Sequence, residues 1–185
     1  MKNIIAFSGS NSSTSINSSL IHYTSSLVDW AKVEIIDLRE YNIPMFSEDL
    51  EKEIGSPDAV KKLANKLIAA DAVIVSTPEH NGMPPAFFKN ILDWLSRSAR
   101  VFLDGQAYLE NTPFLLMSAG PGKGGAGSSR ALVKNMFKHA QADFVDEFQL
   151  GSFYDNFSDG QLTNEELVVQ LNHSLKQLEG KINKK

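Results

Sequence analysis

Three short runs of this chain are almost wholly apolar and restrict the fold more than any other feature of the sequence. They span residues 4–7, 71–77 and 113–119, and each is followed by a loop rich in glycine, proline or serine. A strand without polar alternation is buried on both faces, which is typical of a parallel sheet covered by helices on both sides. The runs therefore predict an α/β fold.

Segments with helical spacing of apolar residues alternate with these strands and with two weaker ones. The predicted strands are completed by residues 32–38 and 144–150, the second of which suits a sheet edge. Ser56, followed by a proline, and Thr163, the start of a capping box, are expected N-caps. Residues 39–55 are most simply interpreted as a solvated loop with a possible short helical turn. The predicted helices span residues 17–30, 56–70, 85–98 and 129–141, and a last helix follows residue 163. Five rounds of strand and helix predict a three-layer sandwich with a five-stranded parallel sheet of order 2-1-3-4-5 and helices on both faces.

Composition excludes several classes of function. The 185 residues suit one domain, 1–185, and no run is long and apolar enough to span a membrane. The N-terminus has no secretory pattern, so the expected location is the cytoplasm. With no cysteine, disulfides and thiolate nucleophiles are excluded, and a net charge of −4 argues against nucleic acid as a partner. No metal site is expected, because the histidines lack ligand spacing: His22, His80, His139 and His173.

The segment after the first strand carries almost only hydroxyl groups. Residues 8–17 read Ser-Gly-Ser-Asn-Ser-Ser-Thr-Ser-Ile-Asn, with Gly9 expected to turn the backbone sharply off the strand. A helix must begin near Ile16, and the free N–H groups at its N-terminus, together with the hydroxyls, can hold a phosphate without any cation. An ordinary N-cap followed by a polar loop explains the same residues equally well.

The loops after the first, third and fourth strands are unusual, and these strands are neighbours in the order 2-1-3-4-5. Ligands of open parallel sheets bind at the carboxyl ends beside the switch point between the first and third strands, so the three loops are expected to form one site. A triphosphate-binding loop and a dinucleotide fingerprint are both missing after the first strand. A mononucleotide with a flat ring, such as FMN, remains.

Two further motifs carry a resemblance to a known family. Residues 78–84 read Pro-Glu-His-Asn-Gly-Met-Pro, and residues 89–97 contain Lys-Asn, then Asp-Trp-Leu-Ser-Arg. Together with Gly9, Ser10, Ser15 and Asn17 and with the glycine-rich residues 118–125, they resemble the NADPH-dependent FMN reductase family, which includes azoreductases and chromate or quinone reductases. The resemblance covers nearly the full length and implies a flavodoxin-like fold. Two positions depart from the family pattern: Ser12 replaces an arginine and His80 replaces a tyrosine.

The resemblance implies FMN as cofactor, with NADPH or NADH as the electron donor. The FMN phosphate would lie among Ser10, Ser12, Ser15, Ile16 and Asn17. The isoalloxazine would lie along Pro78, Glu79, His80, Asn81 and Gly82. Its pyrimidine side would face Ser118, Gly120 and Gly122.

The activity implied is hydride transfer from the nicotinamide to bound FMN and on to a quinone, azo, metal-oxyanion or flavin acceptor. No side-chain acid or base is required, so no catalytic side chain is predicted, and Glu79 is favoured as a structural carboxylate over a proton donor. Lys123 and Arg130 are candidates for the 2′-phosphate of NADPH, although solvated surface cations are favoured. A flavodoxin-like electron carrier or flavin-binding module is the main alternative, and a flavin-free scaffold is a third.

The helix expected over residues 85–98 has two apolar faces, with Phe87, Ile91 and Trp94 on one of them. One face can cover the sheet, and the other requires a second cover. A partner subunit is favoured, with residues 101–103 extending the same patch in a homodimer or tetramer. Burial within its own domain is the alternative.

Overall fold

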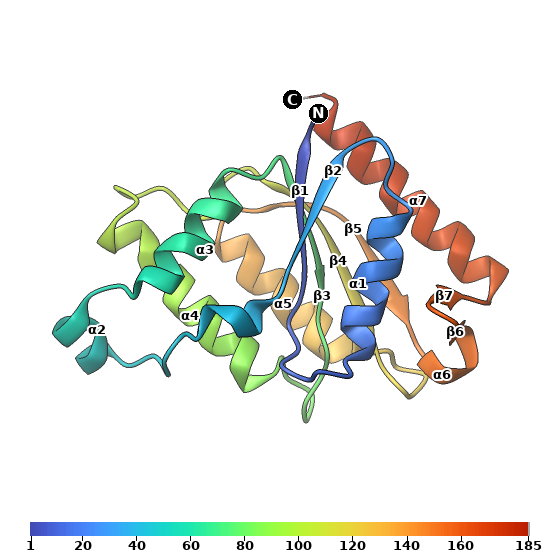
Figure 1. The fold of residues 1–185 in the computed structure, drawn as a ribbon, viewed down its shortest axis with the longest axis horizontal. Coiled ribbons are helices and arrows are strands. Elements are labelled where there is room, and N and C mark those ends of the chain that lie inside the picture. The colour runs from blue at the N-terminus through green and yellow to red at the C-terminus, as the bar shows by residue number, and fades with distance from the viewer. Residues whose placement is uncertain (185) are drawn as a thin grey trace.

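A five-stranded parallel sheet lies at the centre of the computed structural model, which describes residues 1–184 (Figure 1). Its strands stand in the order β2-β1-β3-β4-β5, so the predicted topology is confirmed. The less apolar strand, β5, does lie at an edge, and its pairing with β4 is interrupted by one register shift. The strands are β1 (Asn3–Ser8), β2 (Lys32–Ile36), β3 (Ala72–Ser76), β4 (Pro113–Ala119) and β5 (Asp143–Leu150).

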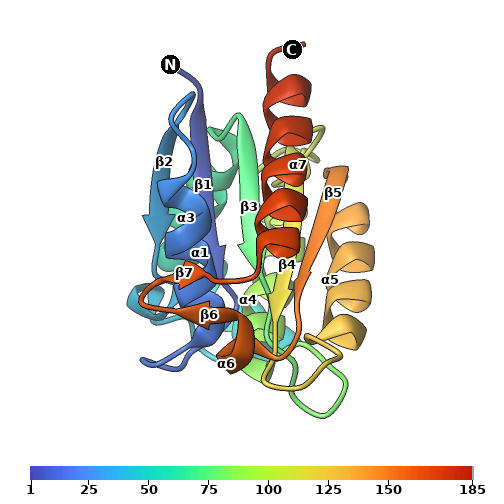
Figure 2. The ribbon, with the colours of Figure 1, turned by 90° about the vertical axis from the view of Figure 1, so that its right-hand side faces the viewer.

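Helices cover both faces of the sheet, which makes three layers (Figures 1 and 2). One face carries α1 (Ile16–Ser26) and α7 (Glu165–Ile182). The other carries α3 (Asp58–Ile68), α4 (Ala86–Val101) and α5 (Gly127–His139). The helix α1 ends earlier than the predicted residue 30. No helix among residues 1–184 is both long and apolar enough to cross a membrane.

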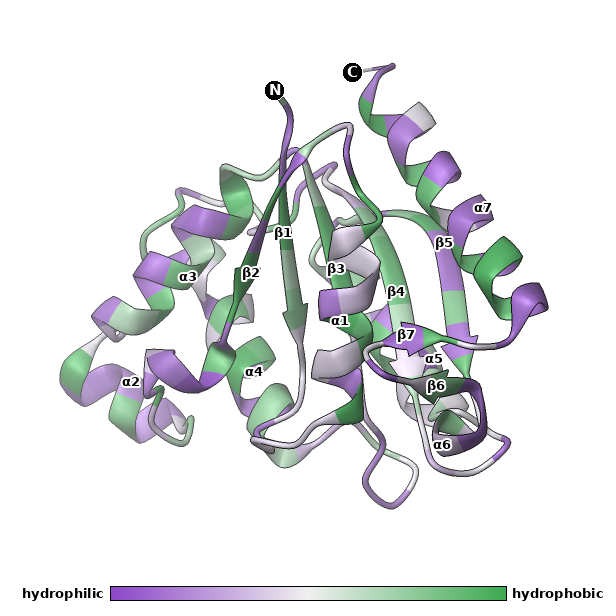
Figure 3. Cartoon of the chain, turned by 45° about the vertical axis from the view of Figure 1, so that its right-hand side comes forward, coloured by the Kyte–Doolittle hydropathy of each residue, from purple (hydrophilic) through white to green (hydrophobic). Residues whose placement is uncertain are grey.

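The central strands contribute to two hydrophobic cores, one on each side of the sheet. Ile4 and Ala6 pack beneath α1 and α7, whereas Ile5 and Phe7 pack beneath the other helices, because successive side chains of a strand point to opposite faces. β3 and β4 divide their side chains in the same way. Figure 3 shows the resulting pattern: β3 and β4 are hydrophobic along their length, while β5 is mixed.

Residues 39–55 are mostly exposed and contain short helical segments, as the sequence allowed, but they also pack against the body of the domain, which the sequence did not predict. They contain a 3-10 helix, η1 (Leu38–Tyr41), and the helix α2 (Glu48–Ile54), and they fold over α4. The carbonyl of Pro44 accepts hydrogen bonds from Trp94 Nε1 at 2.8 Å and Asn90 Nδ2 at 2.9 Å. The ring of Phe46 packs edge-on against Trp94, with centroids 5.1 Å apart.

The apolar residues of α4 are buried within their own chain. Phe88, Ile91, Leu92, Trp94 and Leu95 are each at most 5% exposed within the single chain. The second face of α4 therefore does not require a partner subunit, because Ile43, Phe46 and Leu50 of the same chain pack against this core and leave Phe87 partly buried. A homodimer or tetramer through residues 85–98 and 101–103 remains a prediction. The burial of this helix within its own chain removes the reason that the sequence offered for it.

Two expected N-caps are displaced by one residue. The helix α3 begins after Pro57, and the Ser56 hydroxyl is buried with no hydrogen-bond partner among residues 1–184. Asn164, instead of Thr163, caps α7 by accepting from two backbone N–H groups. Between β5 and α7 the chain forms elements that the sequence did not predict: α6 (Phe153–Asn156) and a hairpin of β6 (Phe157–Ser158) and β7 (Gln161–Leu162).

Candidate functional site

The loops after β1, β3 and β4 meet at the carboxyl end of the sheet and enclose a pocket of about 750 Å³. This volume lies in the range typical of small-molecule and cofactor sites, about 300–1,000 Å³. Three predicted site residues do not line it: Asn81, Gly82 and Ser118. The other ten do, namely Ser10, Ser12, Ser15, Ile16, Asn17, Pro78, Glu79, His80, Gly120 and Gly122.

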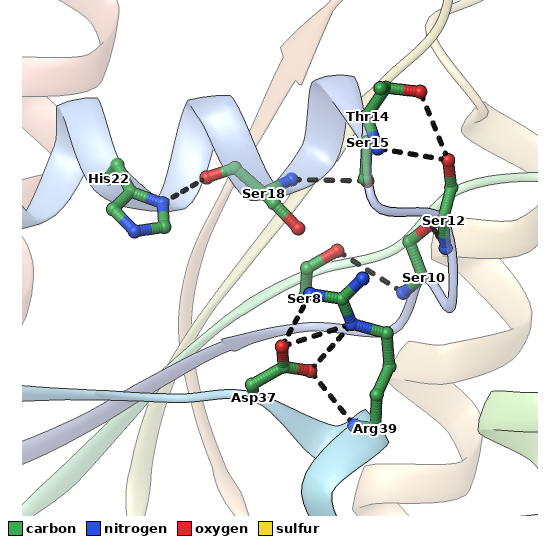
Figure 4. Close-up of polar contacts among 9 residues, drawn as sticks. All are labelled: Ser8, Ser10, Ser12, Thr14, Ser15, Ser18, His22, Asp37 and Arg39. Carbon is green, nitrogen blue, oxygen red and sulfur yellow. Dashed lines mark hydrogen bonds and ion pairs between the residues drawn. The ribbon is translucent and has the colours of Figure 1, made fainter.

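The first wall of the pocket is the serine loop, residues 9–15, whose shape is held by its own hydroxyls (Figure 4). Ser8 Oγ accepts from Ser10 N at 3.2 Å, Ser10 Oγ from Ser12 N at 3.1 Å, and Ser12 Oγ from Thr14 N at 3.3 Å. Ser15 Oγ then caps α1 by accepting from Ser18 N at 3.2 Å. Because the oxygens of Ser10 and Ser15 act as acceptors here, their hydroxyl hydrogens remain free to donate to a ligand.

Gly9 is required for a reason other than the one predicted. Its φ is not among the positive values of the chain, so the turn does not depend on glycine's conformational freedom. A Cβ at this position would lie 2.5 Å from Phe88 Cδ1, because the ring of Phe88 packs directly against the loop backbone. The close packing of the loop backbone against α4 therefore requires glycine at position 9.

Asn17 lines the pocket, but its side chain joins the start of α1 to the ends of β3 and β4. The side chain is 1% exposed, and its Oδ1 accepts from Ser76 Oγ at 2.7 Å and from Ala119 N at 2.9 Å. Its Nδ2 donates to Ala119 O at 3.0 Å. The amide is thus occupied, and the groups directed at an anion are the backbone N–H of Ile16 and Asn17 in the first turn of α1, which have no partner within the helix.

The second wall is the loop after β3, which carries Pro78, Glu79 and His80. His80 and Met83 exchange backbone hydrogen bonds of 2.9 and 3.1 Å around a tight turn formed by Asn81 and Gly82, both at positive φ. An Asn-Gly pair suits such a turn. These two residues form the tip of the loop, which explains why neither lines the pocket.

Glu79 has a structural contact, in agreement with the sequence-based preference. Its carboxylate oxygen Oε2 accepts from the backbone N of Ser129 at 2.9 Å. Ser129 lies in the first turn of α5, where N–H groups lack helical partners and a negative charge is favourable. Glu79 therefore fixes the loop after β3 to the N-terminus of α5.

The third wall is the glycine loop, residues 120–127, which is held by the chain that follows β5. The carbonyl of Gly120 accepts from Phe153 N at 3.1 Å, and that of Gly122 accepts from Ser152 N at 2.9 Å. Gly151 packs so closely that a Cβ on it would collide with the carbonyl of Lys123. The glycine loop is thus fixed mainly by backbone contacts.

Ser118 and Arg130 support the glycine loop from behind. Ser118 is fully buried and donates to Gly125 O at 2.5 Å. Arg130 donates to Ser118 Oγ at 2.8 Å and to Gln149 Oε1 at 2.9 Å, and its side chain is 13% exposed. The expectation that Arg130 is a solvated cation is wrong, since its guanidinium is partly buried and bonded within the fold.

Sequence reasoning missed several lining residues. Thr14 belongs to the same hydroxyl-rich run as the predicted serines, so its composition was a signal that could have identified it. Tyr154 gave no signal, because the hydrogen bonds of residues 152–153 to the glycine loop bring it to the pocket. The remaining lining residues are Ala119, Pro121, Gly124, Gly125, Ala126, Gly127 and Ser128.

The residues present fit a phosphate carried by an organic ring. Neither lysine nor arginine lines the pocket within residues 1–184. Hydroxyls and the N-terminus of α1 gather at the serine loop, and such a set of donors holds an anion through hydrogen bonds and the helix dipole. His80 and the glycine loop line the same pocket, whose volume of about 750 Å³ leaves space for the ring. The fold and the site thus define a flavodoxin-like protein of the FMN-binding class.

Comparison with known proteins identifies the family. A family model for NADPH-dependent FMN reductase matches residues 2–155, and the chain therefore belongs to this family. The cofactor of this family is FMN and its electron donor is NAD(P)H, as the resemblance in the sequence predicted.

Curated proteins and a solved structure are similar to the chain. An NADPH:quinone oxidoreductase of Arabidopsis thaliana is 31% identical over 81% of this chain and 74% of its own length. An uncharacterized protein of Mycoplasma pneumoniae is 39% identical, over 49% of this chain and 52% of its own length. The structure of FerB, a flavoenzyme NAD(P)H:(acceptor) oxidoreductase from Paracoccus denitrificans, matches all of this chain and 98% of its own with a TM-score of 0.78 at 23% identity. The last comparison supports the fold alone.

Proposed function

We propose that this chain is a reductase that takes a hydride from NAD(P)H through bound FMN and delivers electrons to a quinone. The pocket lined by three loops is the observation that carries the proposal, since the hydroxyls of its first wall suit a phosphate and its volume leaves space for a flat ring. When bound there, FMN supplies the hydride chemistry, which requires no side-chain acid or base. The protein's part is to bind and orient the reactants.

The serine loop is proposed to hold the FMN phosphate. Ser10 and Ser15 would donate their free hydroxyl hydrogens, and the N–H groups of Ile16 and Asn17 would complete the donor set. Ser12, which pairs with Thr14 through oxygens 3.3 Å apart, supplies at most a neutral hydroxyl. The phosphate dianion would therefore be bound without a guanidinium.

The other two walls are proposed to hold the ring. Pro78 and His80 would lie along one side of it, and Gly120 and Gly122 would let their backbone approach its pyrimidine side. Asn81 and Gly82, at the tip of the loop, and Ser118, behind the glycine loop, would act only through the positions of their neighbours. These three residues are therefore proposed as supports of the site.

Two flat side chains at the pocket favour an aromatic acceptor. His80 and the 74% exposed Tyr154 both line it, from the loop after β3 and from α6 respectively. A flat quinone can stack against such a ring, whereas a metal oxyanion gains nothing from it. The name of the Arabidopsis relative, a quinone oxidoreductase, agrees with this choice.

The test is an anaerobic reduction followed by a choice of acceptor. The purified protein is loaded with FMN, and the flavin absorbance is recorded after addition of NADPH or NADH. Rapid bleaching supports the reductase, whereas a flavin that stays oxidised would indicate an electron carrier. A protein that takes up no FMN would overturn the proposal.

The reduced protein is then mixed with a benzoquinone, an azo dye, chromate or free FMN. We expect the quinone to restore the flavin absorbance fastest. Faster reoxidation by one of the other three would leave the reductase in place and overturn the choice of acceptor.

A further inference from the structure

A second pocket, of about 290 Å³, lies between α4 and α5 on the face of the sheet that these helices cover. It shares no lining residue with the first pocket, the one formed by the three loops. Gly127 at the start of α5 lines the first pocket, whereas His139 at the end of α5 lines the second. At a rise of 1.5 Å per residue these positions are roughly 18 Å apart along the helix, so the two pockets are separate sites.

The walls of the second pocket are mostly apolar. The helix α4 contributes Leu92 and Ala99, and α5 contributes Met136 and Ala140. Leu92 and Ala140 belong to the hydrophobic core on this side of the sheet, so part of the wall is fixed by core packing. The volume lies just below the range typical of drug-sized ligands, about 300–1,000 Å³, and suits a smaller ligand such as a single aromatic ring.

Tyr108 brings an unpartnered hydroxyl to the second pocket. The residue is 5% exposed, and its ring belongs to the same core. A tight turn holds its backbone, because Glu110 N donates to the carbonyl of Ala107 at 3.1 Å. The hydroxyl makes no hydrogen bond within residues 1–184, yet it is not among the fully buried polar atoms without a partner there, which are Ser25 Oγ and Ser56 Oγ. The hydroxyl is therefore open to the pocket that Tyr108 lines.

The Tyr108 hydroxyl is a donor at every ordinary pH. Burial and, to a smaller extent, the negative charge of Asp93 raise the pKa of Tyr108 well above its usual value. The hydroxyl therefore keeps its proton. Asp93 also lines the second pocket, and no hydrogen bond joins its carboxylate to the tyrosine. A ligand atom can thus be placed between the two groups.

Asp93 offers the matching acceptor. Its Oδ1 accepts from Lys89 Nζ at 2.5 Å, whereas its Oδ2 makes no hydrogen bond or ion pair within residues 1–184. Lys89 and Asp93 both line the pocket and offset each other's charge, so an ionic ligand would lack a counter-charge. His139 is exposed and can be hydrated without a ligand. The polar groups at this pocket therefore suit a neutral ligand that both accepts and donates a hydrogen bond.

We propose that the second pocket binds a small neutral phenol, whose oxygen lies between the Tyr108 hydroxyl and Asp93 Oδ2. The ligand oxygen accepts from Tyr108 and donates to Asp93, while the ring contacts the apolar walls. A phenol suits these groups because it carries a donor and an acceptor on one oxygen beside a flat apolar ring. The assignment is independent of the proposed function, since no residue lines both pockets.

The test is an NMR titration of protein with isotope-labelled methionine methyl groups, loaded with FMN so that the first pocket is filled. Met136 lines the second pocket, and the other methionines do not. Phenol should shift the Met136 signal until it saturates and leave that of the 70% exposed Met45 unchanged. Anisole, which keeps the ring and the acceptor but has no donor, should bind about fivefold more weakly.

Two variants separate the two hydrogen bonds. Tyr108→Phe keeps the ring and removes the hydroxyl, and should weaken phenol about tenfold. Asp93→Asn should weaken phenol severalfold and leave anisole unchanged, because only phenol donates to this carboxylate. Tyr23→Phe is the matched control: it also removes one tyrosine hydroxyl, but Tyr23 lies on α1 at the opposite face of the sheet and does not line this pocket. It should bind phenol as the unsubstituted protein does.

Three results would overturn the assignment. If phenol does not shift the Met136 signal, or binds equally well to Tyr108→Phe, the tyrosine hydroxyl does not bind it. Equal affinities for phenol and anisole in the unsubstituted protein would show that the pocket is an apolar surface without a hydrogen-bonding site. A response to phenol that disappears as the protein concentration is raised would show that a second copy of the chain covers this pocket.

Discussion

The serine loop and the glycine loop face each other across the same pocket, yet they are held in place in different ways. The serine loop is stabilised by its own hydroxyls, each accepting from an N–H two or three residues along the chain. The glycine loop is stabilised by a distant segment, whose backbone donates to Gly120 and Gly122 and leaves no space for a Cβ at Gly151. We infer that side-chain changes are tolerated in the first loop, whereas backbone crowding disrupts the second.

The largest effect is expected where a Cβ enters the contact behind the glycine loop. Gly151→Ala places a methyl group against the carbonyl of Lys123 and should cost about 3 kcal/mol of the free energy of unfolding, because backbone atoms must move. Urea denaturation of the protein without flavin measures the change. In the control Gly124→Ala the added Cβ meets nothing within 4 Å, so stability should change by less than about 1 kcal/mol. Equal effects of both variants would show that crowding against the carbonyl of Lys123 does not lower the stability.

The next effect concerns Asn17, which joins the start of α1 to the strand ends that precede the other two loops. Asn17→Ala removes the hydrogen bonds to Ser76 and Ala119 in a buried site, so the free energy of unfolding should fall by about 2–3 kcal/mol. The control Ser18→Ala lies one residue further along α1, and its hydroxyl makes no hydrogen bond within residues 1–184. A loss below about 0.5 kcal/mol for Asn17→Ala, the range of an ordinary surface change, would mean that these hydrogen bonds do not hold α1 to the ends of β3 and β4.

A smaller effect is expected from a charge added to the serine loop. Ser12→Arg should tighten FMN binding about tenfold, or about 1.4 kcal/mol, because a guanidinium forms charge-assisted hydrogen bonds with a phosphate. The gain should shrink as salt is raised. Ser13→Arg adds the same charge at a neighbour that does not line the first pocket, and should give a smaller gain. An unchanged affinity in Ser12→Arg would show that position 12 does not face the phosphate.

The smallest effect is expected at the cap of α1. Ser15→Ala removes the acceptor for Ser18 N, and loss of such a cap costs about 1 kcal/mol of stability. It should also weaken FMN binding severalfold, because the same hydroxyl is a proposed phosphate donor. Ser15→Thr, which keeps the hydroxyl, should retain most of both. If Ser15→Ala lowers stability and leaves the affinity for FMN intact, Ser15 is a cap only.

Local sequence determined the fold and most of the pocket. Uninterrupted apolar runs such as 71–77 identify buried parallel strands, and serine-rich or glycine-rich loops identify the ends at which they bind ligands. Ten of the thirteen predicted site residues line the pocket for this reason. The position of each of these residues depends mainly on the loop that carries it and on the strand order. Both could be predicted from the sequence.

Only the tertiary structure decided which neighbours each residue meets. Gly9 is fixed by Phe88, a residue 79 positions away, and the second face of α4 is covered by Pro44 and Phe46 instead of by a partner subunit. Tyr154 reaches the pocket because residues 152–153 donate hydrogen bonds to the glycine loop. Such contacts join segments distant in the chain, and periodicity and composition carry information only about residues close together in it.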